Sequence, residues 1–204
     1  MSSSSSVPLH HVFPEVGATS ERPRIPMVSD GRETHFFLSC EYARHVLTVA
    51  LSDAEFGEAV ALAGPSVVCS RPTPGQNIVD PPSPLHFGVH LASLQVGLRF
   101  PLHTAHLSVM SYYGVIPGQF SPTTHMFIAG FLPRCMHLGI RPFIDIFLHF
   151  FHSIRPGGSE SPGYLSISQR AGHRLFEAKS YPDSFKGWRQ KWVWVTSVDG
   201  RGAV

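Results

Sequence analysis

Apolar positions follow a helical period in the middle of the chain and an alternating period near its end. Between residues 85 and 154 they recur every three or four positions, in stretches separated by glycine and proline. This spacing places apolar side chains on one face of an α-helix. The pattern therefore predicts four helices, at residues 85–96, 103–113, 121–138 and 142–154.

The fourth of these stretches, PFIDIFLHFFHSI, is apolar on nearly every face. A helix of this kind belongs in the centre of a core, so we expect it to be the most buried element. Its lone acid, Asp145, is expected either to lie at the helix start or to form a buried salt bridge with Arg134 or Arg141.

Glycine and proline are expected to set the ends of the helices and so to have structural roles. Glycine ends many helices, whereas proline is tolerated in the first turn and bends or splits a helix further along. Pro133 should therefore bend or split the third helix. Arg99, before Pro101 in an extended segment, is expected to cap the carbonyls of the preceding helix. The predicted ends are Gly97, Gly114 and Gly139, and the predicted starts are Ser121 with Pro122, and Pro142.

After residue 163 the period of the apolar positions changes to two, which is typical of β-strands. It predicts strands in YLSIS, HRLFEA and WRQKWVWVTSV. In the last of these, Trp192 and Trp194 should share one face, and Val193 and Val195 the other. The expected fold is thus α+β and mainly helical, with about four core helices followed by a small antiparallel sheet of about three strands.

The first 84 residues have a weaker pattern. Residues 1–33 carry a serine run without apolar periodicity and are expected to form a disordered tail. Residues 34–63 predict a short helical segment, in which Ser52 and Glu55 have the spacing of a capping box. A Pro-rich connector with one short strand at 66–70 should follow over 64–84. We expect a compact domain at 85–198 and a tail at 199–204.

Charge and cysteine content narrow the function classes. The net charge is +2, but residues 1–80 hold five Lys/Arg against nine Asp/Glu, and residues 81–204 hold eleven against five. A basic C-terminal part permits contact with nucleic acid or an acidic partner. Three dispersed cysteines argue against a disulfide framework. No signal peptide or membrane span is evident, so an intracellular protein of the nucleus or cytoplasm is expected.

No constellation of catalytic or metal-binding residues is evident. The chain has thirteen histidines, but no carboxylate or thiol lies at ligand spacing from them, and no phosphate-binding or nucleophile motif is present. We therefore expect no enzyme activity, metal, cofactor or small-molecule substrate. A pocket that brought His103 and His106 together with an acid would instead indicate an enzyme.

The strongest candidate for a binding site is the segment FKGWRQKWVWV. Lys186, Arg189 and Lys191 alternate there with tryptophans, and the candidate binding residues are these three cations and Trp188. Cations bind phosphates and aromatic rings stack on unpaired bases, so these four residues are predicted to contact nucleic acid. The alternative is a strand packed on helices through Trp192 with its cations in solvent.

Five motifs in fixed order identify a resemblance. They are GLRFPLH, YYGVIPGQFSP, AGFLPRCMHLGIRPFIDIFLHFFHSI, RLFE and SFKGWRQKWVWV. Over residues 64–198 the chain resembles the plant gypsy-type transposon domain, a retrotransposon-derived family. The resemblance implies a gag-like region from a plant genome and carries over no catalytic residues.

Two functional hypotheses follow. The first is a non-enzymatic, gag-like domain that contacts nucleic acid or other copies of itself. The alternative is a protein-interaction module, or a degenerate transposon relic without selected activity. An exposed apolar patch on the helical face would favour the interaction module.

Overall fold

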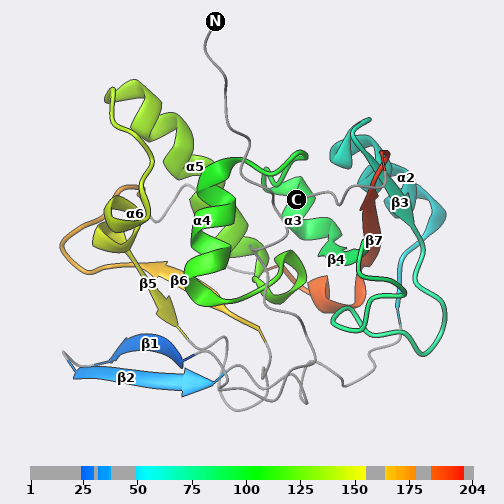
Figure 1. Cartoon of the computed structure of the whole chain (residues 1–204), viewed down its shortest axis with the longest axis horizontal. Helices are drawn as coiled ribbons and strands as arrows, with labels where there is room; N and C mark the ends of the chain where they lie inside the picture. Colours follow the sequence, from blue (N-terminus) through cyan, green and yellow to red (C-terminus); the bar gives the residue numbers. More distant parts are fainter. Residues whose placement is uncertain (1–23, 30–31, 38–48, 155–163, 178–184, 200–204) are drawn as a thin grey trace, which may run out of the picture.

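The fold of the computed structural model is α+β, as predicted (Figure 1). The structure describes residues 49–154, 164–177 and 185–199, together with the backbone of residues 24–29 and 32–37. Within these ranges the elements are β1 (Arg24–Ser29), β2 (Arg32–Phe37), α2 (Asp53–Ala63), β3 (Val67–Ser70), β4 (Phe87–His90), α3 (Leu91–Gln95), α4 (Thr104–Tyr113), η2 (Pro117–Gln119), α5 (Pro122–His137), α6 (Ile144–Phe150), β5 (Phe151–Ile154), β6 (Ser166–Gln169), η5 (Trp188–Gln190) and β7 (Trp192–Ser197).

Two small antiparallel sheets lie on opposite sides of the helices α3, α4 and α5 (Figure 1). In the three-stranded sheet, β7 is central and pairs with β3 and β4, so that Val195 lies opposite both Cys69 and Phe87. The second sheet consists of β5 and β6. Strands β3 and β4 precede the core helices in sequence, so the three-stranded sheet is not built from the three C-terminal stretches that alternation indicates.

The two faces of β7 are buried in different clusters, as the alternation of tryptophan and valine predicts. Val193 and Val195 join the main core, whereas Trp192 and Trp194 pack with Ile78. Ile78 lies in the Pro-rich segment 64–84, whose Gln76 Oε1 accepts a hydrogen bond of 2.8 Å from Trp194 Nε1. This segment therefore covers the tryptophan face of the sheet, and the core extends to residues before Pro84.

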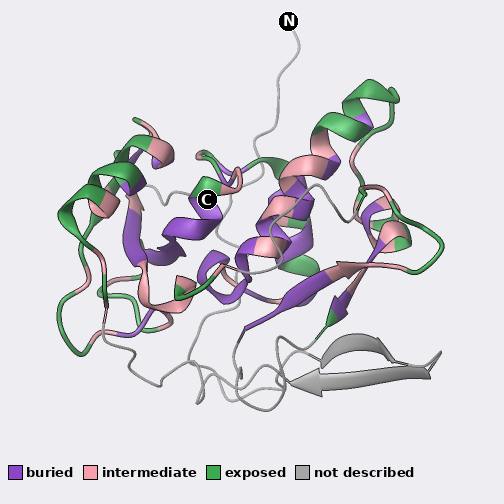
Figure 2. Ribbon diagram, turned by 180° about the vertical axis from the view of Figure 1, so that it is seen from behind, coloured by how far each residue is buried: buried purple, intermediate pink, exposed green. Residues whose placement is uncertain are grey.

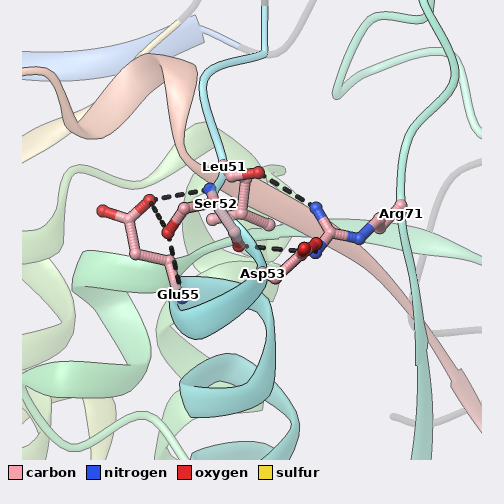
Figure 3. A network of polar contacts seen from close by, with 5 residues as sticks. All are labelled: Leu51, Ser52, Asp53, Glu55 and Arg71. Carbon is pink, nitrogen blue, oxygen red and sulfur yellow. Dashed lines mark hydrogen bonds and ion pairs between the residues drawn. The ribbon is translucent and has the colours of Figure 1, made fainter.

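Helix α2 begins with the predicted capping box (Figure 3). The Ser52 hydroxyl accepts from the Glu55 backbone N–H at 3.2 Å, and the Glu55 carboxylate accepts from the Ser52 backbone N–H at 2.9 Å. Arg71, just after β3, donates to the Asp53 carboxylate at 2.6 Å and to the Leu51 carbonyl at 3.0 Å. These contacts satisfy the helix start and tie α2 to the adjacent sheet.

The second and third predicted helices are confirmed as α4 and α5. Helix α4 ends at Gly114 with φ of 62°, and Gly139, with φ of 64°, follows the end of α5. Ser121 is the N-cap of α5, and Pro122 occupies its first turn. Pro133 lies inside α5, which remains one helix, so the predicted split does not occur.

The first predicted helix is only half correct. Residues 87–90 form β4, and the helix α3 covers just five residues before Gly97, whose φ is 110°. The apolar period of this stretch is compatible with either structure. Residues 87–90 form a strand rather than a helix because they pair with β7, which lies about a hundred residues later in the chain.

The fourth predicted helix is the largest error. Helix α6 begins at Ile144, two residues after Pro142, and only Phe147 in it is fully buried. The remaining FHSI turns into β5, since it pairs with β6. The most buried large side chains instead come from several elements, so no single helix is central.

The stretch HRLFEA is not a strand over its described residues, 173–177. The Gln169 side-chain oxygen accepts hydrogen bonds from the backbone N–H groups of Leu175 and Phe176, at 2.8 and 2.7 Å, and so closes a turn. Phe176 is thereby placed on α5, with its ring 2.9 Å from the position that a Cβ on Gly130 would take. The packing of Phe176 on α5 therefore outweighs the alternation of apolar and polar residues that predicts a strand in HRLFEA.

Strands β1 and β2 pair with each other, and β1 contacts β5. They cover residues 24–29 and 32–37, so part of the stretch predicted to be a disordered tail is paired as strands, while residues 1–23 and 30–31 lie outside the described residues. Among the helices that the structure describes, none combines the length and apolarity needed to cross a bilayer.

Candidate functional site

The predicted basic-aromatic site is largely engaged in contacts within the protein. Trp188, half-buried in η5, has its ring centroid 4.5 Å from that of His90 and 4.9 Å from that of Tyr164, both edge to face. The Arg189 guanidinium lies 5.4 Å from the Tyr164 ring. Aromatic faces and cations used in this way are less available for stacking on bases.

Lys191 is also engaged, because its ammonium forms an ion pair with the Glu55 carboxylate. The hydrogen bond that Lys191 donates in this pair lowers the pKa of Glu55 to about 2, and the hydrogen bond from the Ser52 backbone N–H is the second-largest cause. Of the four residues predicted to contact nucleic acid, Lys186 alone is classed as exposed. The four are neighbours in sequence but do not form one open basic surface.

His90 anchors this segment to the core. Its Nδ1 lies 3.1 Å from the Trp188 carbonyl oxygen, and its Nε2 lies 3.1 Å from the Gly118 carbonyl oxygen. Burial lowers the pKa of His90 to about 3, although the two carbonyl contacts act in the opposite direction. A neutral imidazole donates to only one of these oxygens. His90 therefore links β4, η2 and η5, which gives the basic-aromatic segment a structural role.

A groove of about 740 Å³ lies elsewhere, between α4, α5 and the segments that flank α3 and α6. Its lining is mainly apolar and includes Leu132, Met136, Phe143 and Ile144. The groove is also lined by residues that were expected only to end, separate or begin helices, namely Gly97, Pro101 and Pro142. Four basic or titratable side chains complete it: Arg99, His103, His106 and Arg141.

The two arginines of the groove differ in how they are held. Arg99 Nη1 donates to the carbonyls of Leu94 and Leu98, the latter at 2.7 Å, which confirms the predicted cap at the end of α3. The Arg141 side chain is exposed and makes no hydrogen bond or ion pair with the described residues. Asp145 lies exposed in the first turn of α6 and pairs with neither Arg141 nor Arg134, so of the two expectations for it the position at the helix start is confirmed and the buried salt bridge is not.

The two histidines of the groove come from the start of α4. His103 is its N-cap, and its Nδ1 accepts from the Ala105 backbone N–H at 3.1 Å, so a neutral ring carries its proton on Nε2. His106 is only 3% exposed, and its Nε2 has no hydrogen-bond partner. Burial, assisted by His125 stacked at 5.9 Å, lowers the pKa of His106 to about 3.

Large apolar side chains are exposed beside the groove, at the end of α5 and in the turn that follows it (Figure 2). Met136 is 79% exposed and Phe143 is 56% exposed, and both also line the groove. With Leu138 and Ile140 they form what we call the α5–α6 patch. Scattered exposed apolar residues are common, whereas a cluster next to an apolar groove indicates a contact surface.

The lining residues fit binding better than catalysis. His103 and His106 do meet in one groove, and none of the described residues that line it is Asp or Glu. Among the described residues, no group of three or more His, Cys, Asp or Glu side chains could hold a metal ion. The remaining hydroxyl, imidazole and guanidinium groups are suited to hydrogen bonding an anionic ligand.

Sequence reasoning missed the α5–α6 patch, although a signal for it exists. The run CMHLGIRPF places four large apolar residues around Gly139 and Pro142, which end one helix and precede the next. Apolar residues in such a connection cannot share one helical face. The predicted helices 121–138 and 142–154 instead assign Met136 and Leu138 to the first of the two and Phe143 to the second, and so treat them as buried.

A family model described as "Putative gypsy type transposon" matches residues 89–155. This segment contains every residue that lines the groove and all of the α5–α6 patch, whereas the basic-aromatic segment lies beyond its end. Neither the comparison with curated proteins nor that with solved structures gives a match. Residues 89–155 are thus similar to the gypsy-type transposon domain that the sequence motifs indicate, whereas the motifs RLFE and SFKGWRQKWVWV lie outside the matched segment.

Proposed function

We propose that this chain is a transposon-derived, non-enzymatic interaction module, and that the groove with the adjoining α5–α6 patch binds another protein. The observation that carries the proposal is the continuity of the two surfaces through Met136 and Phe143. A partner that covers both would bury apolar area now in water. Each large side chain so buried contributes roughly 1.5–3 kcal/mol before the costs of association are subtracted.

The prediction of nucleic-acid contact through residues 186–191 is less well supported. Backbone binding requires several cations that reach phosphates, and base stacking requires an accessible aromatic face. Trp188, Arg189 and Lys191 all have partners within the protein. Contact with nucleic acid therefore serves as a competing outcome of the experiment that follows.

Replacing Met136 and Phe143 together by Asp should abolish protein capture by the tagged full-length chain. Two charges in the contact surface would need desolvation without a partner, which costs far more than the apolar area supplies. The measurement is quantitative mass spectrometry of proteins retained from plant cell extract by the wild type and by the double variant. We expect a defined set of proteins to be lost.

The matched control is Val198→Asp, since Val198 is 62% exposed and lies in the turn after β7, outside the patch. Capture by this variant should equal that of the wild type. The proposal fails if no retained protein depends on Met136 and Phe143. Capture that nuclease treatment removes, and that Lys186→Ser weakens, would favour nucleic acid instead.

A further inference from the structure

We propose that the partner presents a short apolar peptide bearing carboxylates, and that Arg141 and Arg99 bind these carboxylates at the edge of the groove. The inference rests on the proposed function and names the chemistry of the bound segment. Two guanidinium groups and no acid among the lining residues make the charge of the groove one-sided. An acidic peptide is the complement of such a surface.

The arginines have donors left for a ligand. A guanidinium has five N–H donors in a planar fork that matches the two oxygens of a carboxylate. Arg99 uses Nη1 for its two carbonyl contacts, and its other nitrogens make no hydrogen bond with the described residues. The guanidinium of Arg141 makes none with them. Outside the lining, Arg134 adjoins Pro133 in sequence and Asp145 adjoins Ile144, so these two exposed residues of opposite charge do not change the balance.

His106 contributes a buried, unpaired polar group to the wall of the groove. Its Nε2 lacks a hydrogen-bond partner in a residue 97% withdrawn from solvent, and the residue lines the groove. Because Nε2 itself has almost no accessible surface, a peptide in the groove does not reach it, and recognition of the peptide falls to the arginines and the apolar lining.

The rest of the lining favours a peptide over a nucleotide or a nucleic acid. Large aromatic faces for base stacking are scarce, because Phe143 is the only Phe, Tyr or Trp among the described residues that line the groove. Aliphatic and proline side chains, such as Leu132 and Pro133, instead suit apolar side chains of a peptide. The groove also continues into the α5–α6 patch, so an extended segment can cover more of the surface than a small organic acid can.

The test is selection of a random peptide library on the immobilised full-length chain, followed by fluorescence polarisation with the selected peptides. Enriched peptides should combine Leu, Ile, Met or Phe with Asp or Glu. Their affinity should fall about tenfold in Arg141→Gln, the expected effect of losing a charged hydrogen bond. High salt should weaken binding to the wild type more than to this variant.

Two controls make the outcome specific. Arg174→Gln removes an exposed arginine outside the groove and should leave the affinity unchanged. Replacing the peptide's Glu by Gln should cost about tenfold with the wild type and little further with Arg141→Gln, as a double-mutant cycle requires.

Neutral or basic selected peptides, or an affinity independent of Arg141, would overturn this inference. If such peptides still lose binding when Met136 and Phe143 become Asp, the proposed interaction module stands and only the acidic partner is wrong. Failure to select any peptide also overturns the inference. The proposed function falls with it only if capture from extract is equally independent of the α5–α6 patch.

Discussion

Acidification from about pH 7.5 to about pH 5 is expected to remove most of the stability of this protein. Burial lowers the pKa of His90 and His106 to about 3 and that of His125 to about 4 in the folded state. An unfolded histidine titrates near 6.5, so below this pH the unfolded chain binds more protons than the folded one. Stability therefore falls as the pH decreases from about 6.5 toward the folded pKa values.

The expected loss is large compared with total stability. At about pH 5 each of these histidines contributes roughly 2 kcal/mol of destabilisation. Together the three contributions amount to about 6 kcal/mol, which lies in the lower part of the 5–15 kcal/mol by which domains are usually stable. Urea unfolding followed by circular dichroism across this pH range measures the effect, as a steady decrease in the free energy of unfolding.

Variants separate the contribution of the buried rings from that of other groups. His106→Leu removes one titrating ring and its unsatisfied Nε2, so the pH dependence should become shallower by about one third. Exposed His137→Gln serves as the matched control and should leave the profile as in the wild type. A free energy of unfolding that is constant between these pH values would contradict the prediction.

The boundaries of α2, α4 and α5 were predictable from the sequence because they depend on local chemistry. The Ser52–Glu55 box, the left-handed Gly114 and the Ser121–Pro122 start each act within one turn of the backbone that they organise. Such signals need no knowledge of distant residues, and α2, α4 and α5 begin and end close to them.

Strands β4 and β5 could not be distinguished from helix in the same way. FGVH and FHSI are short apolar runs that fit either period, and what decides is a partner far along the chain. Phe87 pairs with Val195, and Phe151 pairs with Gln169. The sequence contains both partners but nothing that specifies their register.

The predicted basic-aromatic site shows even more strongly that contacts between distant segments cannot be deduced from local sequence. Lys186, Trp188, Arg189 and Lys191 attract attention because cations and tryptophans adjoin in sequence, yet Glu55, His90 and Tyr164 come from distant segments to engage three of them. The groove has the opposite character. Gly97 and Pro101, which the sequence marks only as breaks between helices, line the groove once α4 and α5 pack together.

A close approach of β4 and η2 holds these parts together. Gly88 and Gly118 face each other there, and a Cβ on Gly118 would lie 2.7 Å from the Gly88 carbonyl oxygen and 2.9 Å from the Ile78 side chain. The same approach places the Gly118 carbonyl against His90 and the Pro117 carbonyl against His125, each at 3.1 Å. Two buried histidines thus depend on the absence of side chains at two glycines.

Gly118→Ala is therefore expected to destabilise the protein by about 3 kcal/mol, the upper part of the usual range for overpacking. The backbone oxygen of Gly88 cannot move away without disturbing the pairing of β4 with β7. Urea unfolding at neutral pH provides the measurement.

Gly57→Ala is the matched control for this substitution. Gly57 lies within α2, and nothing lies within 4 Å of the position its Cβ would take, so the alanine should stabilise the helix by up to about 1 kcal/mol. If the free energy of unfolding falls for Gly118→Ala and rises for Gly57→Ala, the loss at Gly118 has a steric cause, because the entropy effect of replacing glycine is common to both. If Gly118→Ala were as stable as the wild type, β4 and η2 would have to lie further apart, and the contact between His90 and the Gly118 carbonyl would be lost with that approach.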